Sequence, residues 1–199
     1  MGRVHQGLDD RLGEWLERQP VFFVATTPSG PEGHLNVSPK GNRGELAVLD
    51  PHRLAYLDQT GSGVETLSHL RDDGRIVLMA CAFTGPPRIV RVHGRGRAVL
   101  PGDADWPELA AAMRRRGSDP DGPGVRSVVV VEVTRVADSC GYGVPLMPLA
   151  GHRPTMDEWA ARKGAEGIAE YQLSHNSTSI DGLPGLPRGD SPEWSPPAD

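Results

Sequence analysis

Short strand-like segments separated by turns dominate residues 20–137, and this pattern constrains the fold more than any other feature of the chain. Each segment is rich in β-branched, aromatic or other apolar residues and is bounded by Gly, Pro, Asp or Ser. The segments are 21–27, 34–38, 45–49, 53–57, 75–82, 88–100 and 125–136. Only two helices, over 64–72 and 104–116, are predicted between them. We therefore predict a mainly β protein, a six- to seven-stranded antiparallel β-barrel with a few helices, because short turns favour antiparallel neighbours over a parallel α/β sheet.

The residues on either side of 20–137 lack this series of strand-like segments. Residues 8–18 place apolar side chains at helical spacing opposite charged ones and end before Pro20, which predicts an N-terminal helix within residues 1–19. The barrel domain then spans residues 20–137, and residues 138–199 form a C-terminal extension.

The C-terminal extension cannot easily form a core of its own. A helix is predicted over 156–171, where Trp159 and Tyr171 are interpreted as anchors onto the barrel. Residues 190–199 are polar and proline-rich, and we predict that they are disordered. The rest of the extension is expected to pack on the barrel or on a partner subunit.

Charge and composition argue against several classes of protein. The net charge of −5 argues against a nucleic-acid-binding protein, which needs a basic surplus for phosphate contacts. Cys81 and Cys140 lack metal-type spacing, and the histidines form no HxxH or HExxH pattern, so no metal site is expected. No apolar run approaches the roughly 20 residues of a membrane span, and the N-terminus lacks the apolar core of a signal peptide. These absences predict a cytoplasmic protein with no membrane partner.

Three short segments carry the polar residues that could bind a small molecule. Residues 36–41 end a strand in a cluster of polar groups beside a lysine. Residues 56–63 run from a strand through a Gly- and Ser-rich turn to a helix start, where backbone amides and the helix dipole favour an anion. Residues 88–94 carry Arg88 and Arg91, which alternation places on opposite faces of a strand.

Each segment taken alone also has an ordinary interpretation. A Thr-Gly-Ser-Gly turn is often only a turn, and Lys40 alone suits a solvated cation. Arg88 and Arg91 can be outward charges on an exposed strand. The order and spacing of the three segments, rather than any one of them, indicate a common site.

In that order the chain resembles the pyridoxamine 5′-phosphate oxidase-like family, the FMN-binding split barrels, over about residues 20–137. Residues 53–83, RLAYLDQTGSGVETLSHLRDDGRIVLMACAF, match the family's Tyr-bearing strand, small-residue turn, helix and buried strand. Residues 88–94, RIVRVHG, are similar to its Arg-x-Val-Arg-Val-x-Gly strand. The resemblance implies a split barrel that binds FMN at the interface of a homodimer.

The resemblance also implies which residues approach the flavin. The strand ending at Lys40 would line it, the turn at 58–62 would meet the ring edge, ribityl chain or phosphate, and Arg88 would come from the same or the other chain. The implied cofactor-binding residues are Asn36, Val37, Ser38, Pro39, Lys40, Asp58, Thr60, Gly61, Ser62, Arg88 and Arg91. No catalytic residue is assigned by it.

The chain departs from the family's pattern at three places. Its turn reads Ser62-Gly63-Val64 where the true oxidases carry Ser-Arg-Lys, and Ile89 replaces a Gln. The arginine-containing substrate segment near the C-terminus is replaced by NSTSIDGLPGL at 176–186. Pyridoxamine phosphate is therefore not the expected substrate.

Several functions remain open from the sequence. The first is an FMN-dependent oxidoreductase acting on an unidentified small molecule, and a variant of it is a reductase that uses the deazaflavin F420. The second is a non-catalytic protein that binds flavin or haem, which the missing turn cations favour. The third is an unrelated small barrel with a structural role.

Overall fold

The computed structural model of the chain describes residues 2–42 and 44–187, so the predicted disorder of 190–199 lies outside the described residues. The strands are β1 (Val4–His5), β2 (Phe22–Thr26), β3 (Asn36–Lys40), β4 (Leu46–Asp50), β5 (Arg53–Gln59), β6 (Arg75–Cys81), β7 (Ile89–Val99) and β8 (Val125–Ser139). The helices are α1 (Asp10–Glu17), α2 (Glu65–Asp72), α3 (Trp106–Arg115) and α4 (Thr155–His175).

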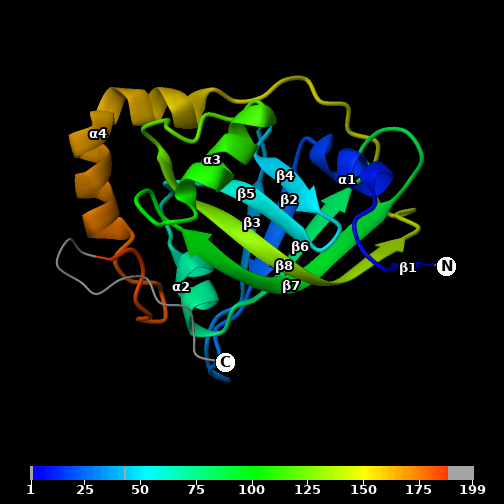
Figure 1. Cartoon of the computed structure of the whole chain (residues 1–199), viewed down its shortest axis with the longest axis horizontal. Helices are drawn as coiled ribbons and strands as arrows, with labels where there is room; N and C mark the ends of the chain where they lie inside the picture. The colour runs from blue at the N-terminus through cyan, green and yellow to red at the C-terminus, as the bar shows by residue number, and fades with distance from the viewer. Residues whose placement is uncertain (1, 43, 188–199) are drawn as a thin grey trace.

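The strands form one antiparallel sheet with two free edges. Their order is β3-β2-β6-β7-β8-β5-β4, and β1 pairs with the end of β8. Figure 1 shows the sheet curling on itself, with the helices around it. Within the described residues β3 and β4 are not paired with each other, so the barrel is split by an open seam between these two edges.

A bulge in β8, opposite Gly94 of β7, helps the sheet to curl. The pairing of β7 with β8 shifts register between His93 and Gly94. A Cβ atom at Gly94 would lie 2.2 Å from the carbonyl oxygen of Glu132, so only glycine allows this close approach. β7 and β8 therefore come unusually close at this point.

The core lies inside the curled sheet and under two helices. Tyr56 and Leu54 of β5 pack with Val90 of β7 and with Leu12 and Leu16 of α1, all of them buried. Burying an apolar side chain of this size stabilises a fold by about 1.5–3 kcal/mol. A second apolar cluster lies under α3 on the outer face of the sheet. The sheet is thereby held as a rigid frame for the residues at its seam.

The structure confirms the mainly β, antiparallel prediction. Each predicted strand and helix has a counterpart whose ends differ by a few residues. The prediction missed β1, which has only two residues and therefore no periodicity to detect. It is a strand because Val4 pairs with Ala137, a contact between opposite ends of the chain that no local pattern reports.

Helix α4 has two arms. Gly164 has φ 66° and ψ 175°, a conformation that glycine alone adopts readily, and the helix turns there. Figure 1 shows the two arms in different directions. Although α4 is the longest helix, no helix in the described part of the chain is long and apolar enough to cross a membrane.

Candidate functional site

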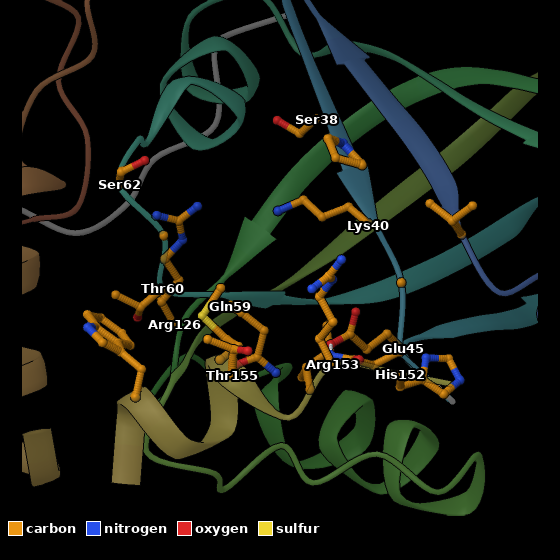
Figure 2. Close-up of a pocket in the computed structure, with 18 of the residues that line it drawn as sticks. Ser38, Lys40, Glu45, Gln59, Thr60, Ser62, Arg126, His152, Arg153 and Thr155 are labelled. Carbon is orange, nitrogen blue, oxygen red and sulfur yellow. Dashed lines mark hydrogen bonds between the residues drawn. The ribbon is translucent and has the colours of Figure 1, made fainter. Parts of the chain in front are cut away.

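A cavity of about 1110 Å³ lies beside the open seam of the sheet. Its walls come from β3 and the turn after it, from the end of β5 and the turn into α2, and from residues 149–171 of the C-terminal extension. Figure 2 shows side chains from these segments around the cavity. Ligand pockets commonly measure roughly 300–1,000 Å³, so this cavity is large enough for a substantial ligand.

A buried carboxylate with two cations forms one wall of the cavity. The Asp58 side chain has no exposed surface, and it accepts hydrogen bonds from Lys40 Nζ at 2.7 Å and from Arg126 Nε at 2.5 Å. Burial raises the pKa of Asp58, but the charges of Arg126 and Lys40 outweigh burial and hold it at about 2. The carboxylate is ionised at neutral pH, so the three groups together carry one net positive charge.

The two cations play different parts in this cluster. Arg126 is only 4% exposed and also donates to the Gly63 carbonyl at 2.8 Å and to Asn176 Oδ1 at 3.0 Å. Lys40 is 17% exposed and lines the cavity. Arg126 therefore ties β8, the turn and the extension together, while Lys40 presents charge to a ligand.

The turn between β5 and α2 offers free backbone amides. The Thr60 amide donates to the Gly124 carbonyl at 2.7 Å, but no acceptor among the described residues pairs with the amides of 61–63. Helix α2 follows at once, and its N-cap residue Val64 provides no side-chain cap. Gly61 faces open space. Free amides beside a helix N-terminus favour an anion.

A strip of hydrogen-bonded polar side chains follows the edge strand β3. Ser38 donates to Asn36 Oδ1 at 3.2 Å, and Asn36 Nδ2 donates to Thr66 at 3.1 Å. Behind this strip, the Thr26 hydroxyl is 3.0 Å from Nδ1 of His69, whose pKa is lowered by burial. The strip gives one wall of the cavity oriented donors and acceptors.

The C-terminal extension is hydrogen-bonded into the site. Gln172 Nε2 donates to Thr60 Oγ1 at 2.7 Å, and Asn176 Nδ2 donates to the Gly61 carbonyl at 3.0 Å. Asn176 is completely buried and also accepts from Arg126. The turn is thus held on one side by the barrel and on the other by the extension.

The kink at Gly164 brings the two arms of α4 together at the cavity wall. Trp159 in the first arm meets Tyr171 in the second edge to face, with ring centroids 5.0 Å apart. Both residues line the cavity. They contact each other beside the pocket, a geometry that their spacing in the sequence does not reveal.

Most of the predicted site residues come together. Those that line the cavity are Asn36, Ser38, Pro39, Lys40, Thr60, Gly61 and Ser62. Asp58 lies behind them without exposed surface and bonds Lys40 and Arg126, which themselves line the cavity. Val37 does not line the cavity and is 64% exposed, because alternation along β3 turns it away from its neighbours.

Arg88 and Arg91 lie apart from this cavity in the chain. Arg88 bonds Asp138 at 2.9 Å and stacks over the Trp15 ring at 5.3 Å from its centroid. Arg91 donates to Ser139 at 3.3 Å. Neither is among the residues that line the cavity.

Sequence reasoning missed Arg126, Asn176 and the extension's part in the pocket. Arg126 had a signal that could have been used, since a lone arginine beside the run of valines at 128–131 must find a buried partner. Asn176 had no such signal. Among the described residues, no group of three or more His, Cys, Asp or Glu side chains is placed to hold a metal ion.

The fold and the pocket together define the class of protein: an antiparallel split barrel with a pocket of cations and free amides at its seam. A family model described as pyridoxamine 5′-phosphate oxidase matches residues 8–140. The chain belongs to this family, and the resemblance inferred from its sequence is confirmed.

One curated relative is a pyridoxamine 5′-phosphate oxidase family protein of Aspergillus flavus, ustO. It is 39% identical over 198 residues, and the match covers 92% of this chain and 77% of the relative. Residues 1–140 alone make up less than 92% of the chain. The match therefore includes part of the C-terminal extension.

Solved structures with a similar chain path include two described as FAD-binding proteins. The one from Mesorhizobium loti has a TM-score of 0.47 and 17% identity, covering 69% of this chain and 96% of that one. The one from Mycobacterium smegmatis has a TM-score of 0.44 and 16% identity, covering 68% and 97%. An FMN-binding protein of Syntrophomonas wolfei has a TM-score of 0.45 and 11% identity, covering 72% and 85%.

Proposed function

We propose that the pocket binds FMN and that the protein is an FMN-dependent oxidoreductase acting on a small molecule. The observation that carries this proposal is the meeting of Lys40, Arg126 and the free amides of 61–63 on one cavity. A phosphate-bearing ligand needs such a combination of charge and directed donors. Membership of the pyridoxamine 5′-phosphate oxidase family supports the same ligand.

The residues present fit a flavin mononucleotide. The amides of 61–63 and the start of α2 suit its phosphate, and Lys40 supplies a partly exposed charge on the same cavity. Asn36 and Ser38 suit the polar edge of its ring system. The Ser-Arg-Lys turn of the true oxidases is absent, and Arg126 supplies in part the charge that the turn lacks.

The charges of the whole cavity wall agree with an anionic ligand. Within the described residues the wall holds the cations Lys40, Arg126, Arg153 and Arg162 but only two acids, Glu45 and Glu65. The surplus is positive even with Asp58 counted behind the wall. This local balance opposes the net charge of the whole chain, which is −5.

When bound, the flavin supplies two-electron redox chemistry, and the chain supplies binding, orientation and electrostatics. The β3 strip and Lys40 fix one edge of the ligand. The extension lines the cavity with Trp159 and Tyr171, which offer aromatic faces beside the ligand. Asp58 keeps Lys40 and Arg126 in place.

We also propose a cytoplasmic homodimer whose cofactor sites lie at the interface. Leu35, directly before the free edge strand β3, and Val37 within it are 77% and 64% exposed. An exposed apolar edge of this kind favours burial against another chain. Arg88 and Arg91 would then act on a flavin as residues contributed by the second copy.

A titration with FMN tests the proposal. We expect Lys40→Ala to weaken FMN binding by roughly 1.5–3 kcal/mol, about 10–150-fold, because a charge-assisted contact is lost. The exposed cation Arg18, which pairs with Glu14 on α1, provides the control variant Arg18→Ala with unchanged affinity. Absorbance of the flavin during the titration gives both constants.

The same spectra decide between the alternatives. A protein whose flavin is bleached by NAD(P)H supports the oxidoreductase, and bound flavin without any turnover supports a non-catalytic binder. Binding of F420 but not FMN supports the deazaflavin variant, and a Soret band supports haem. Equal FMN affinity of the wild type and Lys40→Ala contradicts the site, and an unchanged affinity of Arg88→Ala contradicts the contribution of the second copy.

A further inference from the structure

Glu45 is a buried acid on the cavity wall, and no cation among the described residues is bonded to it. It is only 6% exposed and lies directly before β4, where its amide bonds the Asn42 carbonyl at 3.3 Å and its carbonyl accepts from Leu57 at 2.8 Å. Its carboxyl accepts a hydrogen bond from Asn42 Nδ2 at 3.0 Å. The backbone therefore holds this carboxyl in a defined position on the cavity.

Glu45 lies where two cavities adjoin. The main cavity and a neighbouring one of about 560 Å³ share the lining residues Asn42, Glu45, Leu57, Gln59 and His152. Figure 2 shows Glu45 among the side chains that surround the main cavity, in the part where His152 and Arg153 are drawn. A molecule that occupies the space left beside a flavin would meet this carboxyl.

Glu45 lines the cavity and Asp58 lies behind its wall, and the surroundings shift the pKa values of these two carboxyls in opposite directions. Burial raises the pKa of Glu45, and the hydrogen bonds of Asn42 and Gln59 and the charge of Lys40 only partly oppose it, while Asp58 adds to the rise. Asp58 has its pKa held at about 2. Two carboxyls whose environments separate their pKa values commonly divide into an acid and a fixed charge.

We propose that Glu45 is the proton donor of the pocket and gives its carboxyl proton to a carbonyl oxygen of the substrate. This inference rests on the proposed function. A neutral carboxylic acid donates an O–H hydrogen bond, so the atom that it contacts must be an acceptor, and a ketone, aldehyde or quinone provides one. The substrate class is therefore a carbonyl compound that is reduced.

The proposed step balances with a reduced flavin as the reductant. For an aldehyde or ketone, the flavin would supply a hydride to the carbonyl carbon, the C=O π bond would break, and the oxygen would take the proton of Glu45 to form an alcohol. For a quinone, the flavin would supply two electrons and one hydrogen and Glu45 the second proton, so that both oxygens of the hydroquinone carry hydrogen. Glu45 is left as a carboxylate beside Lys40. It regains a proton from water that enters past His152, which is exposed.

The first test measures protonation of Glu45 directly and needs no turnover. Infrared spectra of the FMN-loaded protein across a pH titration should show a carboxylic-acid C=O band that persists above pH 4.5, the ordinary value for Glu, and is lost in Glu45→Gln. Glu65→Gln changes the other acid of the same wall and should leave this band in place. A wild-type spectrum without the band overturns the proposal.

The second test uses menadione, a quinone, as the probe oxidant. The reduced FMN-loaded wild type should transfer electrons with a rate that falls as Glu45 ionises, and Glu45→Gln should be slower by about 10²–10⁴-fold with that pH dependence removed. A Glu45→Gln rate equal to the wild type overturns the proposal. FMN affinity is measured first on every variant, so failure to bind flavin contradicts the proposed function instead.

Discussion

Two acidic centres of this protein have the same carboxyl pKa and different surroundings. Asp58 lies at the pocket with no exposed side-chain surface and pairs with Lys40 and Arg126. Asp138 lies near the end of β8, 20% exposed, and pairs with Arg88 and His5. The pKa of each carboxyl is about 2.

The causes of the two pKa values differ. At Asp138 the hydrogen bond from the Arg3 amide lowers the pKa most, and those from His5 and Arg88 add to it. At Asp58 the largest influence is burial, which raises the pKa, and two cations must overcome it. A shifted pKa alone therefore does not identify a binding site. What distinguishes Asp58 is that its partner cation, Lys40, lines a cavity.

The structural consequences differ as well. The Asp138 centre joins β1 and β8 to Arg88, which also stacks over Trp15 of α1. It holds the N-terminal segment against the sheet. The Asp58 centre joins the two sides of the open seam, because Lys40 belongs to β3 and Asp58 to β5. The Asp138 centre therefore stabilises the position of the N-terminal segment, and the Asp58 centre stabilises the arrangement of the site.

The largest effect is expected from removing the buried charge. Asp58→Asn leaves Arg126 buried without its carboxylate, and we expect a loss of about 3–5 kcal/mol in the free energy of unfolding. Asp138→Asn is the matched change at the more exposed centre and should cost about 1–2 kcal/mol. Urea denaturation at pH 7 measures both, and equal losses would remove the distinction between the centres.

The next effect concerns the link between the Asp58 centre and the extension. Asn176→Ala removes the acceptor of Arg126 and the donor to the Gly61 carbonyl, so we expect about 1–3 kcal/mol less stability and weaker FMN binding. Glu170→Ala, at an exposed position of α4, is the control and should change neither. Denaturation and FMN titration of the two variants give the comparison. An Asn176→Ala variant that binds FMN as tightly as the wild type would contradict a role of the extension in FMN binding.

The smallest effect is expected in acid. Because the pKa of both carboxyls is about 2, below the ordinary 3.8, the folded protein binds fewer protons than the unfolded chain between these values. The stability that the two groups contribute is complete above pH 3.8 and is lost as the pH falls through about 2. Thermal unfolding from pH 5 to pH 2 should therefore show a smaller decline in Asp138→Asn than in the wild type. Parallel curves would show that Asp138 does not titrate in this window.

The sequence predicted the barrel side of the pocket well and its other side poorly. Asn36, Lys40 and the turn at 60–62 could be selected because strand ends and small-residue turns have local signatures. Arg88 was selected on equally local grounds, yet within one chain it bonds Asp138 instead of lining the cavity. A positive charge on a strand does not report which carboxylate it will meet.

The sequence by itself determined the antiparallel sheet and the family, because alternation, turn residues and motif spacing act over a few residues. The tertiary structure alone decided that Arg126 and Glu45 line one pocket and that the buried Asn176 bonds Arg126. Arg126 lies 68 residues from Asp58, and Asn176 lies 115 residues from Gly61. Partners so distant are chosen by the packing of the sheet and the extension, since a buried polar group must bond whatever the fold places beside it.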